Sequence, residues 1–284
     1  LANRVEELLT LRRIELSERC ARFRRDCPRS DRMPEVLWIQ GQCASLQLKR
    51  RALPDGLVSY DASYPSPASA DVWSQLLHHH PGTPQAALAA WHLAVLDLRE
   101  QRVAQARDAL GEAASRLQAF LQAQPAAALA GSTGELFLPP PTLPAREYCA
   151  DALFKVRWLI WIIDQNALLD DPRAAEAFAE YLRLNPNAFA RGDEHFERLC
   201  ELAGRYEDTR FGDNLRLAVA RAESDPYEEA RALVQLARET TDAAIEAHFQ
   251  LGRLTMQLPV LGLLEGVREP QQYFEIVVAA PPNP

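Results

Sequence analysis

Hydrophobic residues recur along most of this chain at the spacing of α-helices that bury one face. The clearest stretch, residues 225–256, predicts two helices separated by a short turn. Their apolar stripes comprise Ala230, Leu233, Val234 and Ala237 in the first, and Ala244, Ala247, His248, Leu251 and Gly252 in the second. Two such helices need further helices beside them to bury these stripes. The pattern therefore predicts an all-α fold, an irregular α-solenoid of helical hairpins.

The same spacing predicts helices along the rest of the chain, and Ile14 and Leu16 are expected to face inward from the first. No segment alternates convincingly as a strand does, and residues 53–70, which are rich in proline, are expected to form a loop-like insertion. The predicted helices cover residues 1–26, 34–48, 72–80, 86–100, 103–122, 145–169, 173–184, 194–204, 213–221, 227–239 and 243–257, with a helix-like segment at 273–278.

A change of composition predicts the division of the chain into two parts. Residues 125–144 carry a Gly-Ser-Thr-Gly turn and a run of prolines, which is typical of a linker. We expect residues 1–124 to form N-terminal helical repeats that contain the 53–70 insertion. Residues 145–284 are expected to form C-terminal repeats, the last of which is truncated because the pattern thins after Pro259.

Two regular spacings indicate that the hairpins repeat. In three places a hydroxyl residue suited to cap a helix precedes a small residue by eleven positions. The small residue is expected where two helices cross closely, because a larger side chain would push them apart. From Ala218 to Gly252 the interval is 34 residues. The three spaced pairs are Ser30 with Gly41, Thr83 with Ala94, and Thr241 with Gly252.

With this period the chain resembles the tetratricopeptide repeat family over about two thirds of its length. A further copy of the motif places Trp158, Trp161, Ala174 and Phe178 at its Trp, Leu, Ala and Phe positions. The hydroxyl-preceded style is similar to that of bacterial envelope proteins, such as outer-membrane assembly lipoproteins and the Tol-Pal accessory protein. The resemblance implies a helical solenoid that binds another protein, and it favours a periplasmic or cell-envelope location.

The chain departs from the family pattern at several points. The interval from Gly41 to Ala94 is 53 residues, and that from Ile162 to Ala218 is 56. Asp97 and Gln165 also stand where the motif usually has an aromatic residue. These departures favour an irregular solenoid with insertions over a uniform superhelix.

Composition narrows the classes of partner. The chain has 284 residues, of which 48% are hydrophobic and 25% charged, as in ordinary globular proteins. Its net charge of −8 argues against a nucleic-acid partner, because phosphate binding needs a dominant basic surface. The apolar run at 158–163 is far too short to cross a bilayer, so no membrane span is expected in this chain.

Residues that could carry chemistry are few and unfavourably spaced. His78, His79 and His80 are consecutive, so on a helix their side chains point in different directions and are not expected to share a metal. The five cysteines include no Cys-x-x-Cys pair, and none of the common catalytic or nucleotide-binding motifs is present. We therefore predict no catalytic residue, no metal and no cofactor. Phe154, Trp158 and Trp161 are expected to be core.

These observations favour a non-enzymatic scaffold that grips a peptide or a helix of a partner protein in a concave groove. A self-assembling structural subunit of a larger protein is the alternative, with homo-oligomers as its consequence. An all-α enzyme with an acidic cleft is the third possibility. The residues expected to line the groove from the first helix of each hairpin are Trp38, Gln42, Trp91, Asp97, Asn214 and Arg221.

Overall fold

The computed structural model describes residues 2–45, 47–52, 58–63, 66–123, 146–184 and 193–280. The chain divides into two compact units, residues 1–160 and 161–284. The linker predicted at residues 125–144 lies outside the described residues, so the predicted domain boundaries stay predictions.

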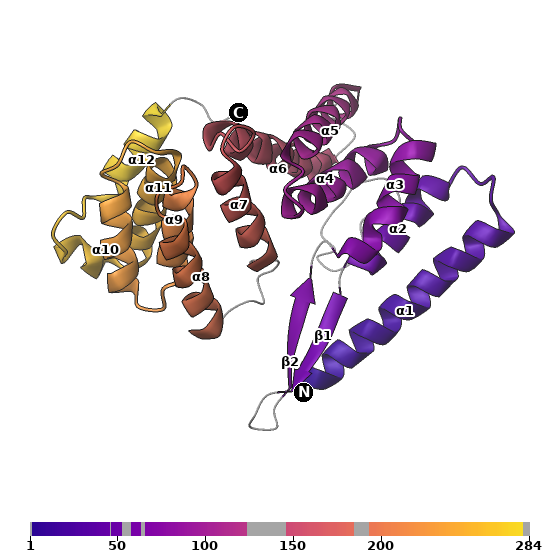
Figure 1. The fold of residues 1–284 in the computed structure, drawn as a ribbon, viewed down its shortest axis with the longest axis horizontal. Helices are drawn as coiled ribbons and strands as arrows, with labels where there is room; N and C mark the ends of the chain where they lie inside the picture. Colours follow the sequence, from indigo (N-terminus) through magenta and orange to yellow (C-terminus); the bar gives the residue numbers. More distant parts are fainter. Residues whose placement is uncertain are drawn as a thin grey trace. The chain divides into compact units, whose positions relative to one another are not determined.

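The first unit is built from helices that pack in chain order (Figure 1). Each of the first four helices packs on the next, and α2 also packs on α4. A sixth helix begins in this unit and continues across the division between the units. The helices are α1 (Ala2–Asp26), α2 (Met33–Ser45), α3 (Ala70–His79), α4 (Pro84–Arg99), α5 (Val103–Ala123) and α6 (Arg146–Gln165).

The second unit repeats this order of packing. Neighbouring helices pack together from α7 to α12, and α9 packs on both α7 and α11. The six helices are α7 (Pro172–Leu184), α8 (Asp193–Arg205), α9 (Gly212–Ala222), α10 (Pro226–Leu236), α11 (Asp242–Gln257) and α12 (Pro270–Ala279). The predicted helical fold is thus confirmed, and the helix-like segment at 273–278 belongs to a complete helix.

A β-hairpin interrupts the first unit and corrects the expectation that no strand is present. Strand β1 (Gln47–Ala52) pairs antiparallel with β2 (Val58–Ser63), from Gln47 opposite Ser63 to Ala52 opposite Val58. The sequence of β1, Gln-Leu-Lys-Arg-Arg-Ala, has no β-branched or aromatic residue, so its composition does not favour a strand. The strand therefore depends on its pairing with β2.

A group of buried serines closes the base of the hairpin. The backbone N–H of Ser66 donates to the carbonyl of Ser45 at 2.7 Å, so the chain leaves and rejoins the helices at one point. The indole N–H of Trp73 donates to the Ser45 hydroxyl at 3.3 Å, and the Ser69 hydroxyl donates to the Ser66 carbonyl at 2.6 Å. The described strands β1 and β2 therefore lie between two residues, Ser45 and Ser66, that are joined directly.

Glycines mark two close helix crossings, as the repeat spacing predicts. A Cβ atom added to Gly41 on α2 would overlap the ring of Trp73 on α3, and one added to Gly252 on α11 would lie 2.9 Å from the ring of Phe274 on α12. At either position an added Cβ would force the neighbouring ring to shift, so glycine lets these helix pairs approach this closely. Ala94, at the third predicted position, is fully buried.

The predicted capping by hydroxyl residues holds at one of the three positions. The Thr83 hydroxyl accepts the backbone N–H of Ala86 at 3.3 Å, and Pro84 follows it at the first helical position. Ser30 instead accepts from Arg32, ahead of α2, and Thr241 precedes α11 without a capping bond from its side chain. The spacing therefore located helix starts more reliably than it predicted the bonds made there.

Two predictions of buried side chains are wrong. Ile14 and Leu16 on α1 are 49% and 43% exposed, since α2 covers only one side of that helix. Phe154 and Trp158 on α6 are also exposed. Val156 is buried on the opposite side of α6, because residues two positions apart point about 160° away from each other. Helix α6 thus carries apolar residues on two faces and buries one.

Candidate functional site

Three of the predicted groove residues gather around His92 on α4. Trp73 from α3 stacks on the His92 ring, with centroids 4.7 Å apart and planes only 6° from parallel. Trp38 from α2 lies 5.8 Å from the same ring, and Trp91 meets it edge-on at 4.7 Å. The Gln42 amide nitrogen lies 3.3 Å from Nε2 of His92, within hydrogen-bonding distance.

This aromatic cluster belongs to the interior of the first unit. His92 is 1% exposed and Trp38 is 7% exposed, whereas Gln42 and Trp91 are half-buried. Burial lowers the pKa of His92 to about 3, so its ring is neutral at physiological pH. The cluster therefore holds α2, α3 and α4 together, and only Gln42 and Trp91 reach towards solvent.

Asn214 occupies a polar cluster in the second unit. Its side-chain amide donates to Oδ2 of Asp242 at 2.9 Å and to Oδ1 of Asn166 at 3.2 Å. Asn166 is itself buried and donates to the Ile162 carbonyl at 3.0 Å. These bonds join the end of α6 to α9 and α11, so Asn214 fixes how three helices meet.

The remaining two predicted residues lie elsewhere. Both the Nε and an Nη of Arg102 donate to Oδ1 of Asp97, at 2.9 and 2.6 Å, and this fork fastens the turn between α4 and α5. Arg221 is exposed on the last turn of α9. The structure thus brings Trp38, Gln42 and Trp91 together in the first unit and does not add Asp97 to them.

The first unit also contains a pocket that the sequence did not indicate. It has a volume of about 600 Å³ and lies among α1, α2 and α3. Arg24 of α1 enters it with both ends of its guanidinium held by neutral side chains: one Nη donates to Oε1 of Gln40 at 2.8 Å and the other to Oε1 of Gln75 at 2.6 Å. Hereafter it is called the Arg24 pocket.

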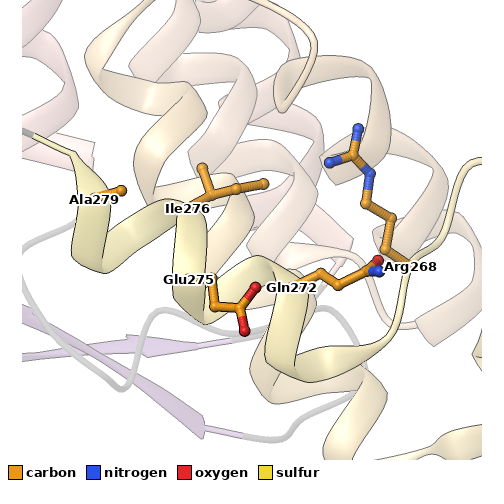
Figure 2. A pocket seen from close by; sticks show the side chains of 5 residues that line it. All are labelled: Arg268, Gln272, Glu275, Ile276 and Ala279. Carbon is orange, nitrogen blue, oxygen red and sulfur yellow. The ribbon is translucent and has the colours of Figure 1, made fainter.

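A second, open hollow lies over α12 in the second unit and has a volume of about 580 Å³. Figure 2 shows the side chains that line it, with Ile276 and Glu275 leaving the helix on different sides. Apart from half-buried Ile276, its lining is exposed. Near it, the backbone N–H of Arg268 donates to the hydroxyl of buried Tyr273 at 2.8 Å, which fastens the segment before α12. The lining residues are Arg268, Gln272, Glu275, Ile276 and Ala279.

Metal ligands and membrane spans were sought over the described residues alone. There, no three His, Cys, Asp or Glu side chains gather as a metal site requires. Within the same residues, no helix combines the length and the apolar character that crossing a membrane demands. Comparison with protein-family models, with curated proteins and with solved structures finds no significant match.

The Arg24 pocket could not be predicted from the sequence, because its parts are far apart in the chain. Gln40 and Gln75 lie 16 and 51 residues from Arg24. The available signal was local charge: residues 11–32 hold eight arginines against four carboxylates in a chain whose net charge is −8. Charge alone does not tell which arginine is held by neutral partners.

Proposed function

We propose that this chain is a non-enzymatic interaction protein of the tetratricopeptide-repeat type that binds a peptide or a helix of a partner protein. The observation that carries the proposal is the pair of glycine crossings, Gly41 against Trp73 and Gly252 against Phe274, each at a position predicted from the repeat spacing. Close crossings at matching positions of two units are typical of stacked helical repeats.

The hairpin insertion supports the same proposal. The 53-residue interval from Gly41 to Ala94 departs from the family period of 34. Residues 46–65 account for 20 of these, because Ser45 and Ser66 are joined directly by a hydrogen bond. Without the insertion the interval is 33 residues, which is close to the period between Ala218 and Gly252.

The packing of alternate helices supports a continuous binding surface within each unit. In a helical-repeat solenoid, the first helices of successive hairpins stack side by side and line the concave face. The α2–α4 contact and the α9–α11 contact have this order. Gln42, Trp91 and Arg221 lie on these helices with side chains that reach solvent.

Site-specific photo-crosslinking tests this function. A benzophenone amino acid is placed singly at Gln42, Trp91 or Arg221 on first helices, and at Glu112 or Gln235, which are exposed on α5 and α10, as matched controls. A partner captured from cell extract is then purified and titrated against the chain. We expect saturable binding and crosslinks from the first-helix positions only.

Three results would contradict the proposal: no purified protein that binds saturably, crosslinks of equal yield from both sets of positions, or crosslinks confined to the controls. The resemblance to envelope repeat proteins further favours a cell-envelope complex. Fractionation of the source cells tests this part separately, since a partner confined to the cytosol would remove it and leave the binding function intact.

One observation favours the alternative of a self-assembling subunit. The second unit exposes several large apolar side chains on and around the segment that joins α11 to α12, and their burial against a second copy would be favourable. These side chains are Met256, Val260, Leu263 and Val278, which are 63%, 50%, 87% and 85% exposed.

A further inference from the structure

Arg24 carries a positive charge that its hydrogen-bond partners do not neutralise. A guanidinium is a cation with five N–H donors, and its two acceptors here, Gln40 and Gln75, are uncharged. Among the described residues, no carboxylate forms an ion pair with it. Of the five N–H groups of a guanidinium, two are used here, so three remain to donate to a ligand.

The two glutamines orient this charge before any ligand arrives. They come from α2 and α3 and hold the guanidinium at both ends, which fixes its plane over the pocket. A guanidinium group that is already held in one orientation loses little conformational entropy when two of its N–H groups bind an oxyanion. The arrangement is therefore suited to select a planar anionic group rather than any negative charge.

The remainder of the Arg24 pocket combines an apolar floor with a polar rim. Met33 and Leu37 of α2 are buried beneath it. Arg29, His79 and His80 lie on the rim, where Asp31 is the carboxylate in the lining. The same end of the chain is the one with an excess of arginines, which attracts anions although the whole protein is acidic.

We propose that the Arg24 pocket binds the side-chain carboxylate of an acidic partner segment, with a neighbouring apolar side chain of that segment on Met33 and Leu37. This inference rests on the proposed function, since it names the chemistry of one part of the bound partner. The carboxylate accepts from the free N–H groups of Arg24. The apolar residue covers the floor and removes water from the ion pair.

Binding of two peptides to the intact chain tests the chemistry of the ligand. The first is a fluorescein-labelled Leu-Glu-Glu-Leu-Glu-Glu-Leu peptide with blocked ends, and the second has glutamine in place of every glutamate. We expect the glutamate peptide to bind about tenfold or more tightly in fluorescence anisotropy, because the glutamine peptide offers no carboxylate to the guanidinium. Equal affinities, or no binding of either peptide, would overturn the proposal.

Two variants with the same change of charge test the place of binding. Arg24→Gln removes the pocket cation, and Arg25→Gln removes its exposed neighbour, which does not line the pocket. We expect the first to weaken the glutamate peptide about tenfold and the second by less than about twofold. Equal weakening by both would assign binding to the general charge of α1. Circular dichroism checks that each variant is folded. If Arg24→Gln does not fold, the comparison of the two peptides on the unaltered chain still tests the proposal.

Competition with small anions tests whether the pocket recognises a carboxylate or a phosphate. Acetate and inorganic phosphate are each titrated against the bound glutamate peptide at constant ionic strength. Displacement by phosphate at much lower concentration than by acetate would mark a phosphate site and overturn the proposal. Failure of the peptide tests, with a crosslinked partner still bound through Gln42, Trp91 or Arg221, would remove the pocket inference alone and leave the proposed function standing.

Discussion

His92 places a titratable ring inside the packing of α2, α3 and α4. Trp38, Gln42, Trp73 and Trp91 are in contact with it, and none of these four is charged. Its pKa of about 3 in the folded chain lies well below the usual 6.5, because burial disfavours the imidazolium. The folded state therefore keeps the ring neutral where the unfolded chain begins to bind a proton.

This difference predicts how stability depends on pH. The contribution of neutral His92 is complete above pH 6.5 and is lost as the pH falls from 6.5 towards 3, at up to about 1.4 kcal/mol per pH unit. The measurement is the decrease in unfolding free energy, determined with urea, between about pH 6.5 and about pH 5. We expect this decrease to be about 2 kcal/mol smaller in His92→Phe than in the unaltered chain.

Exposed His78 provides the control for this measurement. His78→Gln removes a ring outside the packing of α2, α3 and α4, so we expect the loss of unfolding free energy on acidification to stay as large as in the unaltered chain. If His92→Phe lost as much unfolding free energy on acidification as the unaltered chain does, His92 would not be the source of the effect.

These individual environments could not be predicted from the spacing of residues along the chain. His92 is one of three isolated histidines, and it is buried because Trp73, which is 19 residues away, stacks on it. In the same way, Arg24 is one of eight arginines between residues 11 and 32, and only the positions of Gln40 and Gln75 distinguish it. Both cases depend on partners from other helices, which a one-dimensional spacing does not specify.

The positions of helices and of their close crossings were easier to predict than the environments of single side chains. Apolar periodicity located every α-helix described, because burial of one face leaves a repeated signal over many residues. It did not locate the short 3-10 helices at Pro67–Ser69 and Pro259–Leu263. The hairpin was missed since β1 is short and polar, and short strands depend on their partner strand. The inward side of α1 was also assigned wrongly, because a helix covered on one side tolerates exposed leucines and isoleucines.

The glycine crossing between α2 and α3 predicts opposite effects for two chemically identical substitutions. Gly41 and Gly111 both lie inside helices, where alanine is intrinsically favoured by about 1 kcal/mol. A Cβ at Gly41 overlaps the Trp73 ring, whereas at Gly111 the nearest atom is a guanidinium nitrogen of Arg107 at 3.8 Å. We expect Gly41→Ala to lower the unfolding free energy by about 1–3 kcal/mol and Gly111→Ala to raise it by about 0.5–1 kcal/mol.

Thermal and chemical unfolding followed by circular dichroism measure both changes. The comparison removes the general effect of replacing glycine by alanine, so the difference reports the crossing alone. A stabilising effect at both positions would show that α2 and α3 separate easily, and the close approach would then not be a requirement of the fold.

Exposed apolar surface on the second unit predicts a concentration-dependent association if the self-assembly alternative is correct. Leu263 and Val278 are each more than four-fifths exposed, and their burial between copies would favour association by about 25 cal/mol per Å². Under that alternative, the double variant Leu263→Lys with Val278→Lys should weaken association about tenfold or more, because each lysine would have to be desolvated.

Sedimentation equilibrium over a range of concentrations tests this prediction. The control carries Gln257→Lys with Gln271→Lys, which makes the same change of charge at exposed polar positions nearby. A monomer at every concentration in the unaltered chain would remove the self-assembly alternative. Equal weakening by both double variants would attribute any association to charge rather than to the apolar side chains.

Because Ser45 and Ser66 are hydrogen-bonded to each other, the number of residues between them does not determine how α2 and α3 pack. Twenty residues can be lengthened, shortened or exchanged at this place while the helices on either side keep their neighbours, because the two ends already meet. A peptide epitope or a reporter inserted into the hairpin would then leave the packing of the helices unchanged. Evolution has the same freedom, so closely similar helical frames can differ widely in length at this junction.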